Sequence, residues 1–193
     1  MKEISLEMIR DHMDHFPYFS CSSDYTIRTF VRGDERLWAR IEAEVGEFAN
    51  QEQALEHFQA EFGPFLSELE DRCFLLEDKH GEAIGTATAW YGYVAGEKRG
   101  RIHWVGIVPS YQGRKLSKPL LSAVMARLAK DHQKAYLTTQ TTSYQAVNLY
   151  LNFGFAPSFS SDASKEGWLL MEQMLHRKIL QEPQHDPEQK LDT

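Results

Sequence analysis

IHWVGIVPSYQGRKLSKPLL, residues 102–121, changes character twice within twenty positions. It begins as an apolar run, breaks at Pro109, crosses a polar loop and becomes apolar again at helical spacing. This pattern predicts a central, buried strand that leads through a loop into an amphipathic helix. The loop carries three side chains that can contact a phosphate, Gln112, Arg114 and Lys115, although the whole chain has a net charge of −7.

A loop between a strand and a helix is suited to bind an anion. The first N–H groups of a helix have no intrahelical acceptor, and the helix dipole is positive there. We expect Ser117 to cap a helix that starts near Lys118, with Pro119 tolerated in its first turn. From the residues alone, a solvated basic turn before an ordinary helix is the favoured interpretation, and the anion site is the alternative. Neither a G-x-G-x-x-G after a strand nor a phosphate loop ending in Gly-Lys-Ser/Thr is present.

Composition restricts the class of protein. A chain of 193 residues with 42% hydrophobic residues suits one globular domain with a substantial core. No apolar run approaches the ~20 residues of a membrane span, and the first residues lack the apolar core of a signal peptide. We therefore expect a cytoplasmic protein without a membrane partner. The net charge argues against a general nucleic-acid binder. Cys21 and Cys73 show no metal or redox spacing, so we expect reduced thiols.

Periodicity predicts one domain with a segment at each end. Residues 1–23 are expected to be an appended segment, with Ile4, Met8, Ile9 and Met13 at helical spacing. Residues 24–180 are expected to form the domain, and 181–193 a polar, mobile tail. In the first half of the domain we expect a strand at 25–31, helices near 35–48, 51–62 and 65–72, and a hairpin of strands 73–78 and 83–94. In the second half we expect strands at 100–108, 134–141 and 167–175, with helices near 116–128 and 143–153 between them. The second of these helices is expected to open with a capping box of Thr142 and Gln145.

Two motifs resemble the GNAT-type N-acetyltransferases. The stretch VGIVPSYQGRKLSKPLL resembles the family's coenzyme A motif, with Gln112 at its first position. About thirty residues later, AVNLYLNFGF resembles the second family signature through Ala146, Leu149, Tyr150, Gly154 and Phe155. The resemblance implies an α+β fold, an α/β sandwich whose mixed, mostly antiparallel central sheet is flanked by helices. This chain has Lys115 and Ser117 where the family has Gly and Gly/Ala, and Ser143 where an Asn is common.

The resemblance also implies a reaction and a set of binding residues. Acetyl-CoA would be the co-substrate, an amine the acceptor, and transfer would be direct, with no metal required. The residues expected to bind the cofactor are Gly106, Ile107, Val108, Gln112, Gly113, Arg114, Lys115, Leu116, Ser117, Lys118, Ser143 and Tyr150. Of these, Gly106 to Val108 would pair through the backbone with the pantetheine arm.

Two residues are candidates for proton transfer. His103 lies on the expected central strand, where some family members carry a catalytic histidine, and imidazole can accept a proton near pH 7. The alternative is a hydrogen-bonded core histidine. We expect its neighbour Trp104 to face the opposite side of the sheet. Tyr150 stands where the family carries the tyrosine that protonates the departing thiolate; the alternative is a core aromatic.

The acceptor is less restricted. Residues 34–72 contain 11 Asp or Glu and 3 Arg, which would favour a cationic acceptor if they form a rim around the cleft. The alternative is a pair of solvated helix faces. A primary amine of a small molecule or of a peptide fits either case. A non-catalytic acyl-CoA sensor or partner-binding module is the competing function, and a homodimer remains open.

Overall fold

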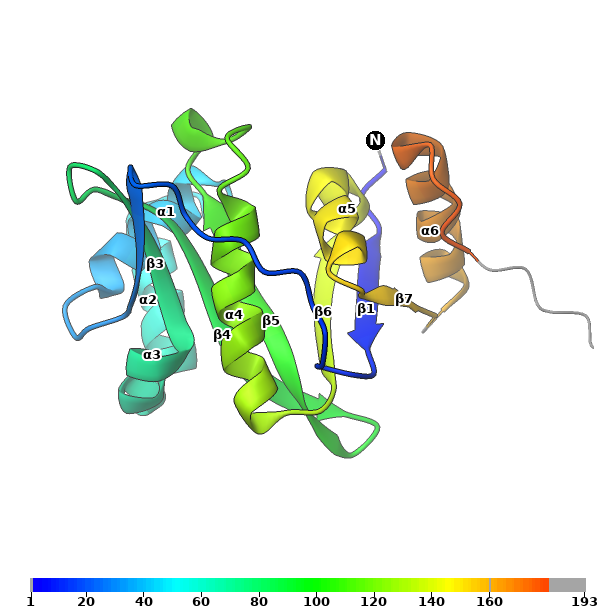
Figure 1. Cartoon of the computed structure of the whole chain (residues 1–193), viewed down its shortest axis with the longest axis horizontal. Coiled ribbons are helices and arrows are strands. Elements are labelled where there is room, and N and C mark those ends of the chain that lie inside the picture. The colour runs from blue at the N-terminus through cyan, green and yellow to red at the C-terminus, as the bar shows by residue number, and fades with distance from the viewer. Residues whose placement is uncertain (1, 160, 181–193) are drawn as a thin grey trace, which may run out of the picture. The chain divides into compact units, whose positions relative to one another are not determined.

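The computed structural model describes residues 2–159 and 161–180 (Figure 1). Helices and strands alternate largely as the sequence predicts. The strands are β1 (Ser5–Arg10), β2 (Tyr25–Thr29), β3 (Cys73–Asp78), β4 (Ala83–Val94), β5 (Glu97–Ile107), β6 (Ala135–Gln140) and β7 (Ala156–Ser158). The α-helices are α1 (Glu35–Glu44), α2 (Gln51–Phe62), α3 (Leu66–Arg72), α4 (Ser117–Asp131), α5 (Tyr144–Asn152) and α6 (Asp162–Leu175), with 3-10 turns at Gly63–Phe65, Pro109–Tyr111 and Thr141–Ser143.

The strands form one sheet in the order β2-β3-β4-β5-β6-β1-β7. β2 to β5 pair antiparallel with their neighbours, whereas β5 and β6 are parallel. The hairpin of β3 and β4 is confirmed, and its turn is tightened by N–H groups of His80 and Glu82 that donate to Asp78 Oδ1 at 2.9 and 3.0 Å. A mixed, mostly antiparallel sheet flanked by helices confirms the predicted fold class.

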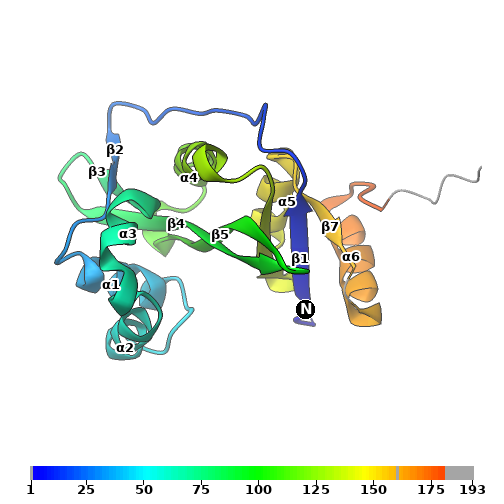
Figure 2. The same ribbon diagram turned by 90° about the horizontal axis from the view of Figure 1, so that it is seen from below.

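The chain divides into two compact units. The central unit is Ile9–Leu137, and the terminal unit combines Met1–Met8 with the chain from Thr138 onward. In the central unit, α4 covers one face of β4 and β5, and α1 and α2 cover the other (Figure 2). The core beneath α1 and α2 is aromatic: the ring centroid of Trp38 lies 5.2 Å from that of Phe58 and 5.4 Å from that of Trp104. Such rings bury large apolar areas and fix the helices on the sheet.

A β-bulge interrupts β5 in the middle of this face. Thr86 pairs with Gly106 and Thr88 with His103, so Trp104 and Val105 together oppose one residue of β4. Trp104 has a φ of 48°, a left-handed conformation that is uncommon for a bulky residue. The extra residue shifts the alternation of side chains along β5. Consequently His103 and Trp104 both face α2, and the prediction that Trp104 lies on the opposite side of the sheet is wrong.

Two elements of the terminal unit correct the sequence prediction. Residues 5–10 form a strand and no helix, because Ile4, Leu6 and Met8 are buried at a period of two. Residues 162–175 form α6 and no strand. A capping box of Ser161 and Ser164 starts this helix, and Trp168 and Met171 continue its buried stripe.

The start of α5 also differs from the prediction. Its N-cap is Ser143, which follows a 3-10 turn, and no side-chain hydrogen bond caps the helix. The Thr142–Gln145 capping box is therefore wrong. The hydroxyl of Thr141 instead bonds to the backbone beside β1. It donates to the Lys2 carbonyl at 2.7 Å and accepts from Ile4 N–H at 3.0 Å, and these bonds hold the residues before β1 against the 3-10 turn at Thr141–Ser143.

The remaining expectations concern the ends of the chain and the thiols. The division at residues 23 and 180 stays a prediction, and the expected tail, 181–193, lies outside the described residues. Cys21 and Cys73 are both free thiols. In the part of the chain that the structure describes, no helix is both long enough and apolar enough to cross a membrane.

Candidate functional site

One edge of β5 is available for a ligand in the central unit. β5 pairs with β6 only at Gly100–Ala135 and Arg101–Tyr136. Further along, Gly106 and Ile107 pair with β4, and Val108 N–H donates to the Ile84 carbonyl at 2.9 Å. Their other side can accept an extended molecule as an added strand. Gln112 Nε2 donates to the Ile107 carbonyl at 2.9 Å, so this predicted cofactor residue holds the end of the strand.

The loop after β5 has backbone N–H groups that the described part of the fold does not use. Gly113 has a φ of 77° and Lys115 a φ of 62°, so two left-handed residues wind the chain into the start of α4. Within the described residues, the N–H groups of Gly113, Arg114, Lys115 and Leu116 have no acceptor. Because these groups precede the positive end of a helix, the loop has the geometry of an anion site.

The N-terminus of α4 differs from the prediction in one respect. The helix begins at Ser117 itself, with Leu116 as N-cap and no side-chain hydrogen bond at the cap. Leu116 is buried, and this anchors the chain one residue earlier than a Ser117 cap would require. Ser117 is therefore not the capping residue, and Lys118 directs its ammonium over the Phe19 ring, 4.9 Å from the centroid.

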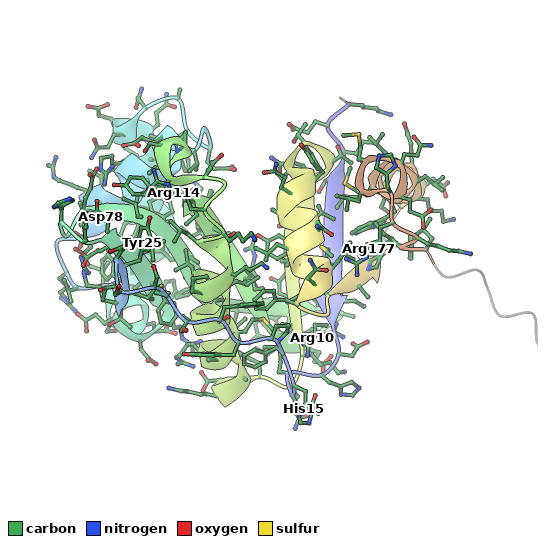
Figure 3. The ribbon with its side chains drawn as sticks, turned by 45° about the horizontal axis from the view of Figure 1, so that its top comes forward. Arg10, His15, Tyr25, Asp78, Arg114 and Arg177 are labelled. Carbon is green, nitrogen blue, oxygen red and sulfur yellow. The ribbon has the colours of Figure 1, made fainter. Side chains whose placement is uncertain are left out.

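Arg114 is held by aromatic residues of neighbouring segments. Its guanidinium donates to Tyr25 Oη at 3.3 Å and to the Ser110 carbonyl at 3.2 Å, and it lies 4.6 Å from the Tyr111 ring centroid. Tyr111 in turn donates to Asp78 Oδ2 at 2.7 Å. Figure 3 shows Arg114, Tyr25 and Asp78 in the same region of the central unit. Arg114 is thus a positioned cation at the loop.

Lys115 is different, because its exposed side chain makes no hydrogen bond or ion pair with any described residue. We expect Lys115→Ala to weaken coenzyme A binding about tenfold, because a charge-assisted hydrogen bond contributes roughly 1.5–3 kcal/mol and exposure reduces that value. Calorimetry with coenzyme A and dephospho-coenzyme A measures it; a contact with the diphosphate gives the same loss for both ligands.

Lys115→Gly is the matched variant for this prediction. Glycine removes the same ammonium but also relieves a left-handed φ, which costs roughly 1–2 kcal/mol for other residues. If the ammonium binds the diphosphate, both variants lose affinity. If both bind as tightly as the wild type at low salt, the prediction is wrong and the backbone alone holds the ligand. Lys130→Ala, at the other end of α4, controls for net charge.

His103 belongs to a hydrogen-bonded cluster centred on Glu61 of α2. Glu61 Oε1 contacts His103 Nε2 at 2.7 Å, and Glu61 Oε2 accepts from Trp104 Nε1 at 2.8 Å. His57 Nε2, one helical turn earlier on α2, lies 3.1 Å from Glu61 Oε2. The bulge makes this arrangement possible, since it brings two consecutive side chains of β5 to the same carboxylate.

The protonation states of the pair follow from their surroundings. Burial would raise the pKa of Glu61, but the hydrogen bonds and the charge of its donors outweigh burial and lower that pKa to about 2. Burial lowers the pKa of His103 below 6.5, and the charge of Arg101 acts in the same direction against the hydrogen bond to Glu61. An ionised Glu61 can only accept, so neutral His103 carries its proton on Nε2 and has Nδ1 as the basic nitrogen.

A pocket of about 440 Å³ opens beside this cluster, lined by His57, Ala60, Glu61, Arg101, His103 and Trp104. The pocket is shallow and widely open to solvent, and its volume lies within the range of small-molecule sites. The pocket combines an imidazole that can accept a proton with one guanidinium and an indole. This combination supports proton abstraction from a polar ligand.

The other two predicted site residues lie in the terminal unit. Tyr150 is on α5, only 7% exposed, and its ring centroid lies 6.3 Å from that of Phe155. Ser143 is half-buried at the start of the same helix. Gly154 has a φ of 82° and ends α5, as the signature predicts.

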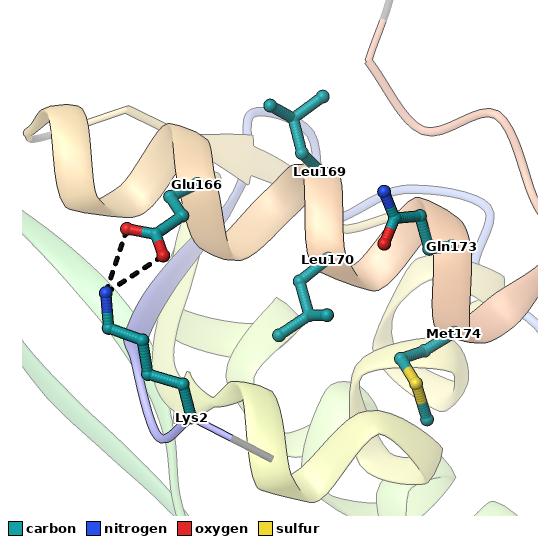
Figure 4. A pocket seen from close by; sticks show the side chains of 6 residues that line it. All are labelled: Lys2, Glu166, Leu169, Leu170, Gln173 and Met174. Atoms are coloured by element: carbon teal, nitrogen blue, oxygen red, sulfur yellow. Dashed lines mark hydrogen bonds and ion pairs between the residues drawn. The ribbon is translucent and has the colours of Figure 1, made fainter.

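A second pocket, of about 530 Å³, lies in the terminal unit along α6 (Figure 4). Leu169, Leu170 and Met174 supply its apolar lining, and its two ionic groups, Lys2 and Glu166, pair with each other at 2.9 Å. It therefore presents no base to a ligand. Across the described residues, no group of three or more His, Cys, Asp or Glu side chains is placed to hold a metal ion.

The sequence did not identify Glu61, His57 or Glu42 as notable residues. His57 and Glu61 have an i, i+4 spacing that places them on one helix face, but the partner on β5 is 42 positions away. Glu42 of α1 is 1% exposed, and its Oε1 has no hydrogen-bond partner in the described structure. Burial first, and the charge of Glu47 second, raise the pKa of Glu42 to about 8.

In the described structure, five of the 11 acids in segment 34–72 are paired with arginine. Arginines from inside and outside the segment form ion pairs with Asp34, Glu44, Glu68, Glu70 and Asp71. Arg28 of β2 pairs with Asp34 and Arg127 of α4 with Asp71, whereas the pairs of Glu44 and Glu68 lie within single helices. They favour the alternative in which the acids have structural and solvated roles over a cationic-acceptor rim.

Comparison with known proteins adds the family. The model of the acetyltransferase (GNAT) family matches residues 18–155. Mycothiol acetyltransferase of Streptomyces griseus is 28% identical over 134 residues, which cover 67% of this chain and 42% of that protein. The fold is similar to that of a GCN5-related N-acetyltransferase from Sphaerobacter thermophilus, with a TM-score of 0.63, 23% identity, and coverage of 81% of this chain and 49% of that one.

A third similarity concerns a protein of comparable length. An aminoglycoside N-acetyltransferase in complex with CoA has a TM-score of 0.58 and 19% identity, covering 74% of this chain and 95% of that one. In contrast, this chain spans about half the length of the Streptomyces and Sphaerobacter proteins. The family match covers most of the central unit and the second motif, and the chain therefore belongs to the acetyltransferase (GNAT) family.

Proposed function

We propose that this protein transfers an acetyl group from acetyl-CoA directly to a primary amine of a small molecule or peptide, within a ternary complex. The observation that carries the proposal is the hydrogen bond of 2.7 Å between His103 and Glu61, at the bulge of the strand that leads into the candidate anion-binding loop. One strand would thereby present the donor and the base together.

The donor would be bound by the backbone of this chain. The unpaired N–H groups of the loop and the N-terminus of α4 suit a diphosphate. The open edge of β5 at Gly106 and Ile107 suits the amides of the pantetheine arm. Holding donor and acceptor together supplies much of the rate, because oriented reactions reach high effective molarities.

The proposed chemistry removes two protons from the acceptor nitrogen and adds one to the leaving sulfur. Neutral His103 takes a proton from the acceptor ammonium, whose pKa of about 10.4 keeps it charged near neutral pH. The free amine attacks the thioester carbon and a C–N bond forms. As the C–S bond breaks, coenzyme A leaves as a thiolate and the new amide nitrogen loses its second proton, which replaces the proton that Tyr150 donates. Tyr150 is the candidate that returns a proton to the thiolate. The names of the similar proteins, a mycothiol acetyltransferase and an aminoglycoside N-acetyltransferase, support transfer to an amine without identifying the acceptor here.

Release of coenzyme A thiol from acetyl-CoA across a panel of amines and peptides tests the proposal. Acceptor-dependent release supports an enzyme. Binding of acetyl-CoA by calorimetry without turnover for any acceptor would contradict it and favour an acyl-CoA-binding module.

Tyr150→Phe tests the role of the acid. We expect kcat to fall about tenfold or more, at the lower end for general acid catalysis because a thiolate is a good leaving group. The Kd of acetyl-CoA should change little, since the ring remains. Tyr144→Phe, at the first position of α5, is the matched control. An unchanged kcat in Tyr150→Phe would assign Tyr150 to the core alone.

A further inference from the structure

Arg101 is placed on the same face of the sheet as His103. The two residues are two positions apart on β5, before the bulge, so their side chains share a face. The opposite face is covered by α4, since a Cβ on Gly100 would approach Leu128 at 3.0 Å. Arg101 therefore faces the α2 side and lines the pocket of about 440 Å³ together with His57, Glu61 and Trp104.

The guanidinium of Arg101 lacks an anionic partner. Its Nε is buried without a hydrogen-bond partner, and no carboxylate of the described residues forms an ion pair with it. Its guanidinium carbon lies 5.9 Å from the ring centroid of Tyr136. Arg99, two residues earlier on the same face, is in contrast paired with Glu97 at 2.8 Å. Arg101 as a whole is partly buried, so in the described structure only its Nε is both shielded from water and unpaired. A bound anion would supply that buried donor with an acceptor.

The carboxylate of the pocket is already saturated. Glu61 contacts three nitrogens, of His103, Trp104 and His57, at 2.7 to 3.1 Å. It has little capacity left for a ligand ammonium or for Arg101. What the pocket offers to a ligand is thus the hydrogen-bond donors of Arg101, rather than the free carboxylates that the acid-rich segment 34–72 suggests.

We propose that Arg101 is a specificity-determining residue, and that the preferred acceptor is an amine that also carries a carboxylate. The inference rests on the proposed acetyl transfer. The carboxylate pairs with the Arg101 guanidinium, and the amine lies toward His103. Two residues of a strand advance about 7 Å, so amine and carboxylate are separated by a few bonds, as in a small amino acid or the acidic end of a peptide. The planar fork of arginine suits a carboxylate bidentately.

The experiment compares three acceptors that differ at one end: 4-aminobutyrate, butylamine and 1,4-diaminobutane. Thiol release is measured at pH 8.5, where His103 is neutral in every variant, because loss of the Arg101 charge also raises the pKa of His103. We expect the wild type to prefer 4-aminobutyrate by about tenfold or more in kcat/KM. Arg101→Gln should lower kcat/KM for 4-aminobutyrate about tenfold to a hundredfold and leave butylamine within about twofold.

Two further variants keep the test sharp. Arg99→Gln removes a guanidinium from the same strand and face outside the pocket, and should leave the preference unchanged. Arg101→Lys keeps the positive charge but lacks the planar guanidinium, so it should retain part of the preference for 4-aminobutyrate. This variant tests the proposal if Arg101→Gln does not fold. Preference for the diamine in the wild type, or an equal loss for 4-aminobutyrate and butylamine in Arg101→Gln, overturns the proposal.

Failure of the proposed function gives a separate result. If none of the three compounds is acetylated, calorimetric titration with 4-aminobutyrate in the presence of coenzyme A tests Arg101 alone. Binding to the wild type and to Arg99→Gln, with at least a tenfold loss in Arg101→Gln, supports an anion-recognition role without acetyl transfer. Absence of binding to the wild type overturns it.

Discussion

His103→Gln is expected to lower kcat about 100- to 10,000-fold at pH 7.5, the range typical of a general base. Glutamine keeps a hydrogen-bonding side chain of similar length beside Glu61 but cannot accept the proton of an ammonium. The Kd of acetyl-CoA should stay within about twofold, because the proposed donor contacts lie further along β5 and in the loop. Steady-state thiol release and calorimetry measure the two quantities.

The pH profile gives the same prediction a second readout. His103 acts in its neutral form, and burial lowers its pKa below 6.5, so kcat/KM should rise with pH through a midpoint below 6.5 and then level off for this group. Glu61→Gln removes the partner that raises the pKa of His103, so the midpoint should move further down. His103→Gln should lack this limb.

His57→Gln is the control for the cluster. Its imidazole contacts the same carboxylate at 3.1 Å, but its side chain is 43% exposed and it lies on α2 rather than on the strand. We expect a loss of less than about tenfold, from the weakened positioning of Glu61. If His57→Gln abolishes turnover and His103→Gln does not, the base is His57 and the assignment is wrong.

The path from β5 to α4 was predictable because its signals are local. The prediction used an apolar run, the break at Pro109, and a polar loop followed by apolar residues at helical spacing. Each of these signals can be recognised from neighbouring residues alone. The family resemblance then supplied the candidate cofactor loop and the candidate acid Tyr150, both of which stay predictions. The start of α4 was missed by one residue because the burial of Leu116, which no local rule captures, outweighs the capping preference of Ser117.

The errors at the two ends of the chain have a common cause. Ile4 and Met8 are four apart, a spacing that fits one face of a helix and one face of a strand equally well. Trp168 to Met171 form a continuous apolar run, which periodicity cannot assign. In that second case a local signal existed: Ser161 and Ser164 form a capping box, which marks a helix start seven residues before Trp168.

The cluster around Glu61 could not be derived from spacing. The bulge that turns Trp104 toward α2 requires a φ of 48° in a bulky residue, and tertiary packing against Trp38 and Phe48 holds it there. Without the bulge, strict alternation separates His103 from Trp104. The candidate base was therefore predictable, but the carboxylate that orients it was visible only in the fold.

Glu42 leads to the second prediction, which concerns stability. This carboxyl is packed under α1 against β5, where a Cβ on Gly106 would lie 3.4 Å from its Oε1, and it has no hydrogen-bond partner among the described residues. Burial raises its pKa in the folded protein to about 8, whereas an unfolded glutamate has a pKa of about 4.3. The folded protein therefore keeps a proton that the unfolded chain has released between these two values.

The sign of the effect follows from this difference. Where the folded state binds more protons, the free energy of unfolding falls as pH rises. The loss begins above pH 4.3, reaches a slope of about 1.4 kcal/mol per pH unit, and levels off above the folded pKa of about 8. Over the window it amounts to roughly 4–5 kcal/mol at most, a large part of the 5–15 kcal/mol that is typical of a folded domain.

Glu42→Gln should remove this dependence, because glutamine has nearly the same shape and no charge to bury. At pH 5 wild type and variant should melt at similar temperatures, since Glu42 is protonated in the folded wild type. At pH 8.5 the variant should be more stable, with a Tm higher by on the order of 10 °C. Glu47→Gln removes an exposed neighbour that only adds to the repulsion, so its effect should be much smaller. Thermal unfolding of wild type and Glu42→Gln from pH 5 to 9 tests this prediction. If the Tm values of the two proteins change in parallel with pH, the prediction is wrong. Glu42 would then ionise normally, with a partner for its carboxylate in solution.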